Sequence, residues 1–227
     1  MMNSRTFFTV AFAAVLLSGA ASAATLGKDE AASGLKAALN QGASKAISAL
    51  GKADGFLGNA EVRIPLPGKL QKARKTLRKV GLKKEVEALE LAMNRAAEAA
   101  VPQARTLFVD AISRMTVADA LNIINGPQDA ATQYFRSSMT APLTEAFLPI
   151  VGKSTADLDV ARTYDKLASK ASVVGIVDPQ DATLDAYVTR KALDGLFLMM
   201  AREEAAIRKN PLGQADALLR KVFGKGN

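Results

Sequence analysis

The fold of this chain is decided by residues 181–209, DATLDAYVTRKALDGLFLMMAREEAAIRK, the most apolar helical stretch after the N-terminal segment. Large apolar side chains recur along it, at Leu184, Val188, Leu193, Leu196, Phe197, Leu198, Met199, Met200 and Ile207. A helix that is apolar around most of its circumference is usually buried. We therefore expect this helix to lie at the centre of a bundle. Glycine inside a helix costs about 1 kcal/mol relative to alanine, so Gly195 indicates close contact with another helix or room for a ligand, and we favour the contact.

The remaining segments also have helical patterns, and no alternating strand pattern of useful length appears. In the first half of the chain the predicted helices are 29–50; 69–80, ended by Gly81; and 83–115, kinked or divided at Pro102. A capping box of Thr116 and Asp119 opens a short helix. Further helical pieces follow Pro127 and are bracketed by Pro142 and Pro149, and the last predicted helices are 155–174 and 211–223. These patterns predict an all-α fold, a single-domain bundle of about eight or nine helices over residues 24–227.

One long irregular segment, residues 51–68, interrupts the helical patterns. Glycines and prolines break the periodicity there, and proline biases the residue before it away from the helical conformation. The segment contains the extended run 62–67, VRIPLP, and has apolar side chains at Phe56, Leu57, Val62, Ile64 and Leu66. We therefore expect it to lie against the body of the protein as an ordered strap.

The first 23 residues have the pattern of a secretory signal peptide. Arg5 provides a positive start, residues 7–17 are apolar apart from Thr9, and Ala21-Ser22-Ala23 offers the small residues that signal peptidase accepts. Because this apolar run is shorter than the roughly 20 residues that span a bilayer, we expect cleavage near Ala23 and release rather than anchoring. The sequence thus predicts a periplasmic protein that does not span a membrane.

Composition restricts the chemistry. The 227 residues include no cysteine, no histidine and no tryptophan, which excludes disulfides, thiol catalysis, cysteine–histidine zinc sites and Ser-His-Asp hydrolysis. We assign no catalytic residues and expect no cofactor and no metal. The sequence favours a non-enzymatic role, and a hydrolase that uses Asp and Glu alone is the remaining enzymatic alternative.

The positive charge of the chain is concentrated in one segment. The net charge is +8, and eight basic residues without an acid lie between positions 69 and 84: Lys69, Lys72, Arg74, Lys75, Arg78, Lys79, Lys83 and Lys84. We expect Leu70, Leu77 and Val80 to face the core and the cations to face outward. This surface suits an anionic envelope component, such as phospholipid or lipopolysaccharide phosphate, or an acidic protein. Residues 69–84 include no aromatic side chain on which a base could stack, which argues against nucleic acid as the partner. The alternative to a binding surface is an amphipathic helix face that only contacts solvent.

A second candidate site combines residues from two helices. Arg136 follows Tyr134 and Phe135, and stacking together with a carboxylate such as Asp110, Asp119 or Glu98 would hold its guanidinium group. Asn94 and Glu98 are four residues apart on a helix and point inward in this interpretation. The functional interpretation is a ligand site formed by Tyr134, Phe135, Arg136, Asn94 and Glu98. The alternative is structural: a buried ion pair for Arg136, and helix capping or a hydrogen bond between helices for Asn94 and Glu98.

The chain resembles a known bacterial family over nearly its whole length. The segments that carry the resemblance are 54–56, DGF; 64–67, IPLP; 94–98, NRAAE; 110–112, DAI; 115–116, MT; 119–120, DA; Gly126; 131–136, ATQYFR; 149–151, PIV; 193–197, LDGLF; 203–204, EE; and 219–224, LRKVFG. Their order and spacing are similar to those of domain of unknown function 4197. The resemblance implies an exported helical protein and supplies no catalytic residues.

Two functions are compatible with these observations. The first is a binding or interaction module at the cell envelope, acting through residues 69–84. The alternative is a carrier of a small apolar or amphiphilic ligand, held between helices near Phe135, Phe197 and Met199, with Arg136 meeting the polar head of the ligand.

Overall fold

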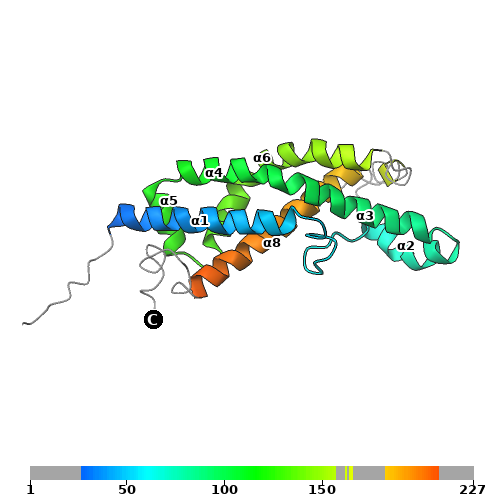
Figure 1. The fold of residues 1–227 in the computed structure, drawn as a ribbon, viewed down its shortest axis with the longest axis horizontal. Helices are drawn as coiled ribbons and strands as arrows, with labels where there is room; N and C mark the ends of the chain where they lie inside the picture. Colours follow the sequence, from blue (N-terminus) through cyan, green and yellow to red (C-terminus); the bar gives the residue numbers. More distant parts are fainter. Residues whose placement is uncertain (1–26, 157–161, 163, 166–181, 210–227) are drawn as a thin grey trace, which may run out of the picture.

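The protein is built from helices that run along one long axis (Figure 1). A computed structural model describes residues 27–156, 162, 164–165 and 182–209. Within these ranges every regular element is helical, which confirms the all-α prediction. The predicted signal peptide, the predicted helix 211–223 and most of the predicted helix 155–174 lie outside the described residues.

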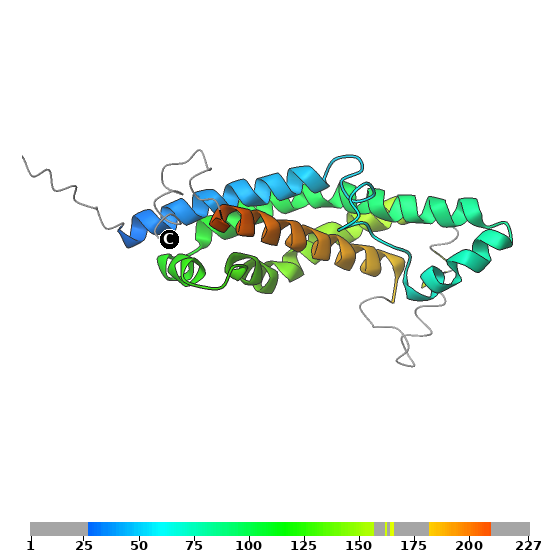
Figure 2. The same ribbon diagram turned by 90° about the horizontal axis from the view of Figure 1, so that it is seen from below.

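The helix α8 (Leu184–Lys209) has many buried residues, as its apolar sequence predicts, and shares the interior of the bundle with α6. It packs against α6 (Ala130–Thr155), α1 (Lys28–Leu50) and α3 (Lys83–Ala100) (Figures 1 and 2). Its core side chains Leu184, Val188, Ala192 and Leu196 are completely buried. Burial of such apolar surface contributes about 25 cal/mol per Å², so the contacts of α8 are an important source of stability in this cysteine-free chain.

Prolines act differently in two helices. Pro102 divides the predicted helix 83–115 as expected: α3 ends at Ala100, the 3₁₀ turn η1 (Val101–Gln103) contains the proline, and α4 (Ala104–Arg114) follows. The prediction that Pro142 and Pro149 separate helical pieces is wrong, because α6 continues through both. The predicted count of eight or nine helices is not confirmed.

Packing explains why α6 continues through its prolines. Every fourth residue of α6 is buried: Ala131, Phe135, Met139, Leu143, Phe147, Val151 and Thr155. A proline inside a helix costs about 3 kcal/mol. Burying one large apolar side chain contributes about 1.5–3 kcal/mol, and α6 buries several, so the continuous apolar stripe outweighs the two missing hydrogen bonds.

The short helix α5 (Val117–Ile124) begins with the predicted capping box. The Asp119 backbone N–H donates to the Thr116 hydroxyl oxygen, and the Thr116 N–H and hydroxyl donate to the Asp119 carboxylate. The hydrogen bonds from the Thr116 side chain and backbone lower the pKa of Asp119. This box fixes the direction in which the chain leaves α4.

A buried carboxylate from α8 joins three helices. Glu204 accepts hydrogen bonds from the backbone N–H groups of Ala131 and Thr132, so it caps α6, whose own N-cap side chain makes no capping bond. Arg208, one turn further along α8, pairs with Glu204 and donates to the Ile123 carbonyl at the end of α5. The negative Glu204 therefore lies at the N-terminus of α6, where the helix dipole is positive. The positive Arg208 lies at the C-terminus of α5, where the helix dipole is negative.

Residues 51–67, here called the strap, form the predicted irregular segment and lie against the bundle. Phe56 and Ile64 are buried, and Phe56 packs directly on Gly195 of α8. A Cβ atom at position 195 would lie 2.7 Å from Phe56 Cε1 and 3.2 Å from Val62 Cβ. Gly195 therefore marks a close contact, as the sequence predicts, but the neighbour is the strap and not another helix.

This contact predicts opposite outcomes for two helical glycines. Gly195→Ala is expected to destabilise the protein by about 1–2 kcal/mol, because overpacking against the strap outweighs the better helix propensity of alanine. Gly42→Ala, on α1, is expected to be neutral or to stabilise by up to about 1 kcal/mol. A Cβ there meets its nearest neighbours at ordinary distances of 3.6 and 3.7 Å. Urea denaturation followed by circular dichroism measures both, and an equal effect at the two positions would contradict the close packing at Gly195.

Candidate functional site

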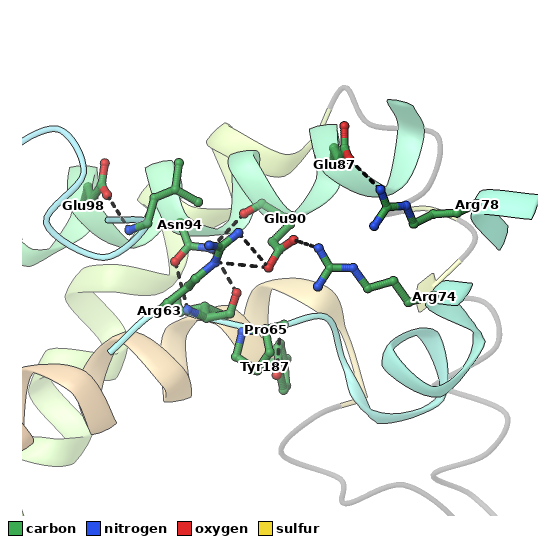
Figure 3. A network of polar contacts seen from close by, with 11 residues as sticks. Arg63, Pro65, Arg74, Arg78, Glu87, Glu90, Asn94, Glu98 and Tyr187 are labelled. Atoms are coloured by element: carbon green, nitrogen blue, oxygen red, sulfur yellow. Dashed lines mark hydrogen bonds and ion pairs between the residues drawn. The ribbon is translucent and has the colours of Figure 1, made fainter. Parts of the chain in front are cut away.

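Three polar residues of α3 hold the strap in place. Glu90, Asn94 and Glu98, here called the polar row, are spaced four residues apart on α3. Side chains four apart lie on one face of a helix. All three are buried, with exposed fractions of 5%, 0% and 4%. Figure 3 shows them side by side, facing the strap. Buried polar groups must be hydrogen-bonded, and here the strap supplies the partners.

Asn94 pairs with the backbone of the strap like a strand neighbour. Its side-chain oxygen accepts the Ile64 N–H at 2.9 Å, and its side-chain nitrogen donates to the Ile64 carbonyl at 2.9 Å. The same nitrogen donates to the Glu90 carbonyl at 2.8 Å. One side chain therefore satisfies both backbone groups of Ile64, a buried residue just before Pro65. The chain is not helical there, so the usual helix partners for these backbone groups are missing.

Glu98 binds the other end of the strap. One carboxylate oxygen accepts the N–H groups of Phe56 and Leu57, at 3.0 and 3.1 Å. The other oxygen accepts a hydrogen bond from Arg95, which also reaches Asp54 at 2.7 Å. The hydrogen bonds that Arg95 donates to Glu98 and, second, to Asp54 raise the pKa of Arg95. Asp54 has a φ of 62°, the left-handed region, so this network holds a turn that non-glycine residues rarely adopt.

Glu90 connects the strap to the helix α2 (Gly68–Lys79). Its carboxylate pairs with Arg63 of the strap at 3.1 Å and with Arg74 of α2 at 2.8 Å (Figure 3). On the opposite side of the strap, the Tyr187 hydroxyl of α8 donates to the Pro65 carbonyl at 3.0 Å. The strap is therefore clamped between α3 and α8, and α2 is attached to the same clamp.

The structure does not bring the five predicted ligand residues together. Asn94 and Glu98 bond to the backbone of the strap, a non-helical segment, and not to a neighbouring helix as the structural alternative suggested. Phe135 is buried in edge-to-face contact with Phe108 and Tyr134, with ring centroids 5.3 and 5.4 Å apart. The ligand-binding interpretation of these side chains stays a prediction.

Arg136 faces α8 on the outside of the bundle. Its guanidinium group lies over the Phe197 ring, 4.8 Å from the centroid, so the stacking ring comes from α8 and not from the adjacent Tyr134 and Phe135 that the sequence suggested. Its carboxylate partner is Asp194 at 3.4 Å, and not one of the three acids suggested by the sequence. Half of the Arg136 side chain is exposed, so this pair lies at the surface and contributes little to stability.

Tyr134 lines a surface groove between α5 and α6. The groove has a volume of about 410 Å³ and is lined by Asp119, Asn122, Ile123, Ala130, Gln133, Tyr134 and Ser137. Burial of the Tyr134 hydroxyl, and then the nearby charge of Asp119, raise the pKa of Tyr134. The lining combines the exposed polar side chains of Asn122, Gln133 and Ser137 with less exposed and partly apolar ones, and Arg136 is not among the lining residues.

The predicted basic residues gather at one end of the molecule. Helix α2 and the start of α3 form the basic hairpin, residues 68–84, which extends beyond the body of the bundle at the end opposite the start of α1 (Figures 1 and 2). None of the described side chains of α2 is buried. Lys69 lies in α2, and its side chain is outside the described part of the structure.

The cations of the basic hairpin fall into two groups. Arg74 is paired with the buried Glu90, and Arg78 and Lys83 both lie 3.9 Å from Glu87. The second group consists of exposed lysines that form no ion pair with any described residue: Lys72, Lys75, Lys79 and Lys84. Sequence reasoning did not separate these groups, because the partner carboxylates Glu87 and Glu90 lie outside the basic segment.

The turn of the basic hairpin exposes apolar side chains. Val80 is 66% exposed and Leu82 is 43% exposed. The prediction that Val80 faces the core is wrong, because α2 ends at Lys79 and the chain turns through Gly81, at a φ of 91°, beyond the edge of the bundle. Leu77, in contrast, packs against the core. The sequence signal that could have found this turn is the pattern 79–83, KVGLK, with apolar residues around a glycine and lysine on both sides.

Comparison with protein families gives one match. The family described as a protein of unknown function (DUF4197) matches residues 25–224. The chain belongs to this family. No curated protein and no solved structure matches the chain. In the described ranges, no helix combines the length and the apolar character needed to cross a membrane. Within DUF4197, this chain therefore has to be interpreted from its own geometry.

The polar row predicts that two asparagines differ in importance. Asn94→Ala is expected to destabilise the protein by about 2–4 kcal/mol, because the Ile64 N–H and carbonyl would remain buried without partners. Asn40→Ala is the matched control. Asn40 donates to the carbonyl four residues earlier in the same manner, but it is exposed. Its replacement is expected to change the free energy of unfolding by less than about 0.5 kcal/mol. Similar losses for both variants in denaturant titrations would rule out the clamp described here.

Proposed function

We propose that this protein is an exported binding module of the cell envelope that attaches to an anionic surface through the basic hairpin. The signal-peptide pattern of residues 1–23 supports export to the periplasm. The exposed lysines of the hairpin support the anionic partner. The observation that carries the proposal is that Lys72, Lys75, Lys79 and Lys84 share one protruding hairpin and form no ion pair with a described residue.

The electrostatic argument depends on which cations are available. A paired cation such as Arg74 has already lost much of its attraction for an external anion, because Glu90 lies 2.8 Å away. An exposed lysine near an anionic membrane surface contributes about 1 kcal/mol. This attraction decays over about 8 Å at physiological ionic strength, so the lysines must approach the surface together. A hairpin at the end of an elongated molecule allows that approach.

The attachment of the hairpin to the body also suits this function. Glu90 holds Arg74 and thereby sets the direction of α2, and among the described α2 side chains only Arg74 and Leu77 are partly buried. The hairpin is therefore held in a defined orientation without being part of the core. Its outward charges can act on a partner without a cost to the fold.

Carriage of a small ligand is the weaker candidate. The aromatic region proposed for it is filled by protein, since Phe135 and Phe197 are 0% and 1% exposed. The groove beside Tyr134 offers about 410 Å³, in the range of ligand sites, but Arg136 does not line it. A small molecule retained in native mass spectra of the purified protein would favour the carrier.

The proposal predicts that position, and not only charge, determines binding. The variant with Lys72, Lys75 and Lys79 replaced by Gln is expected to bind anionic vesicles roughly 100-fold more weakly, from about 1 kcal/mol per lysine. The control replaces the exposed lysines Lys28, Lys52 and Lys209 by Gln, which removes the same charge elsewhere. Protein exported to a bacterial periplasm is tested by sedimentation with phosphatidylcholine vesicles, with and without phosphatidylglycerol.

Circular dichroism checks that both variants keep the helicity of the parent protein. The parent is expected to lose vesicle binding as salt is raised, because screening weakens surface electrostatics. Unchanged binding of the hairpin variant, or an equal loss in both variants, would refute attachment through the hairpin.

A further inference from the structure

The most exposed large apolar side chain in the described ranges lies at the tip of the basic hairpin. Val80 is 66% exposed and Leu82 is 43% exposed, on either side of Gly81. Single exposed apolar residues are common on protein surfaces. Here two exposed apolar side chains lie at one protruding turn, with a lysine on each side of the pair. Attraction between lysines and an anionic surface does not explain why these apolar side chains are exposed.

Backbone hydrogen bonds set the conformation of this turn. The Leu82 N–H donates to the Leu77 carbonyl at 3.0 Å, and the Gly81 N–H donates to the Arg78 carbonyl at 3.4 Å. Together with the positive φ of Gly81, these bonds form a Schellman motif, which ends a helix in a fixed geometry. Val80 is therefore held away from the bundle, while Leu77 beneath it packs against the core.

Charged groups surround the apolar tip. Lys79 precedes Val80, and Lys83 and Lys84 follow Leu82. The acids nearest in sequence are Glu85 and Glu87 on α3, and Glu87 is shared between Arg78 and Lys83. Apolar side chains flanked by lysines match the two layers of an anionic bilayer surface. The lysines can contact the outer layer of lipid phosphates, and the apolar side chains can contact the acyl chains beneath it.

We propose that Val80 and Leu82 insert into the boundary between headgroups and acyl chains of an anionic phospholipid bilayer, while the surrounding lysines contact lipid phosphates. This inference rests on the proposed function and names lipid as its anionic partner. The positive charge of the tip favours an anionic partner. The exposed side chains of Val80 and Leu82 favour a bilayer over a purely polar polyanion, because a polyanion has no apolar layer. An acidic protein is an outcome of the test below.

The absence of tryptophan from the chain makes insertion directly measurable. In Val80→Trp the only tryptophan lies at the tip. Its emission is expected to shift to shorter wavelength with vesicles that contain phosphatidylglycerol, and brominated acyl chains are expected to quench it. Val109→Trp, at a position on α4 that is 50% exposed, is the control and is expected to show neither change. No shift for Val80→Trp under conditions in which the protein sediments with vesicles would overturn insertion.

A second variant separates insertion from charge. Replacing Val80 and Leu82 by Ser keeps every lysine and is expected to weaken vesicle binding roughly tenfold, because partial burial of two apolar side chains is lost. Binding to soluble polyglutamate is expected to stay unchanged in this variant and to fall in the Lys72, Lys75 and Lys79 variant. Since both side chains are exposed, the fold is expected to remain intact by circular dichroism.

The two proposals fail in different ways. If the lysine variant loses vesicle binding and the serine variant does not, insertion is refuted and attachment through charge stands. If the lysine variant keeps vesicle binding, the proposed function itself is refuted. Binding to polyglutamate without binding to anionic vesicles would identify an acidic protein as the partner and refute lipid insertion.

Discussion

The structure depends on the need to satisfy a non-helical backbone inside a helical protein. The strap has no helix or strand partner of its own, yet Phe56 and Ile64 are buried. Buried N–H and carbonyl groups without partners cost about 1–3 kcal/mol each. The polar row of α3 removes this cost through Asn94 and Glu98, which bond the strap at both ends. The apolar side of the strap can then pack on Gly195, and α3 and α8 are joined through it.

The same row extends to the surface through Glu90. This carboxylate contacts Arg63 of the strap and Arg74 of α2, so the basic hairpin takes its direction from the clamp and not from a core of its own (Figure 3). A burial of charge is costly unless the charge is paired, and two guanidinium groups meet that requirement. The arrangement leaves the outward lysines and the apolar tip available to a partner.

Carboxylates in this protein serve the backbone in two separate places. Glu98 accepts two strap N–H groups, and Glu204 accepts the first N–H groups of α6. Each is accompanied by an arginine one turn away on the same helix, Arg95 and Arg208. In a chain without imidazole or thiol groups, these buried acids would be the first candidates for catalysis, but their oxygens are already occupied by structural hydrogen bonds.

The sequence by itself determined the helical class, the buried character of α8, the division at Pro102 and the capping box at Thr116. It also determined the irregular strap and the position of the positive charge, because each of these features depends on periodicity, composition or the conformational limits of single residues. Only the tertiary structure decided that α6 continues through Pro142 and Pro149, because packing on neighbouring helices outweighs a local penalty. It also decided that Asn94 and Glu98 serve the strap, that Arg136 pairs with Asp194, and that Val80 faces outward. These outcomes depend on which distant segments meet, and that information is set by the summed packing of the bundle rather than by any local pattern.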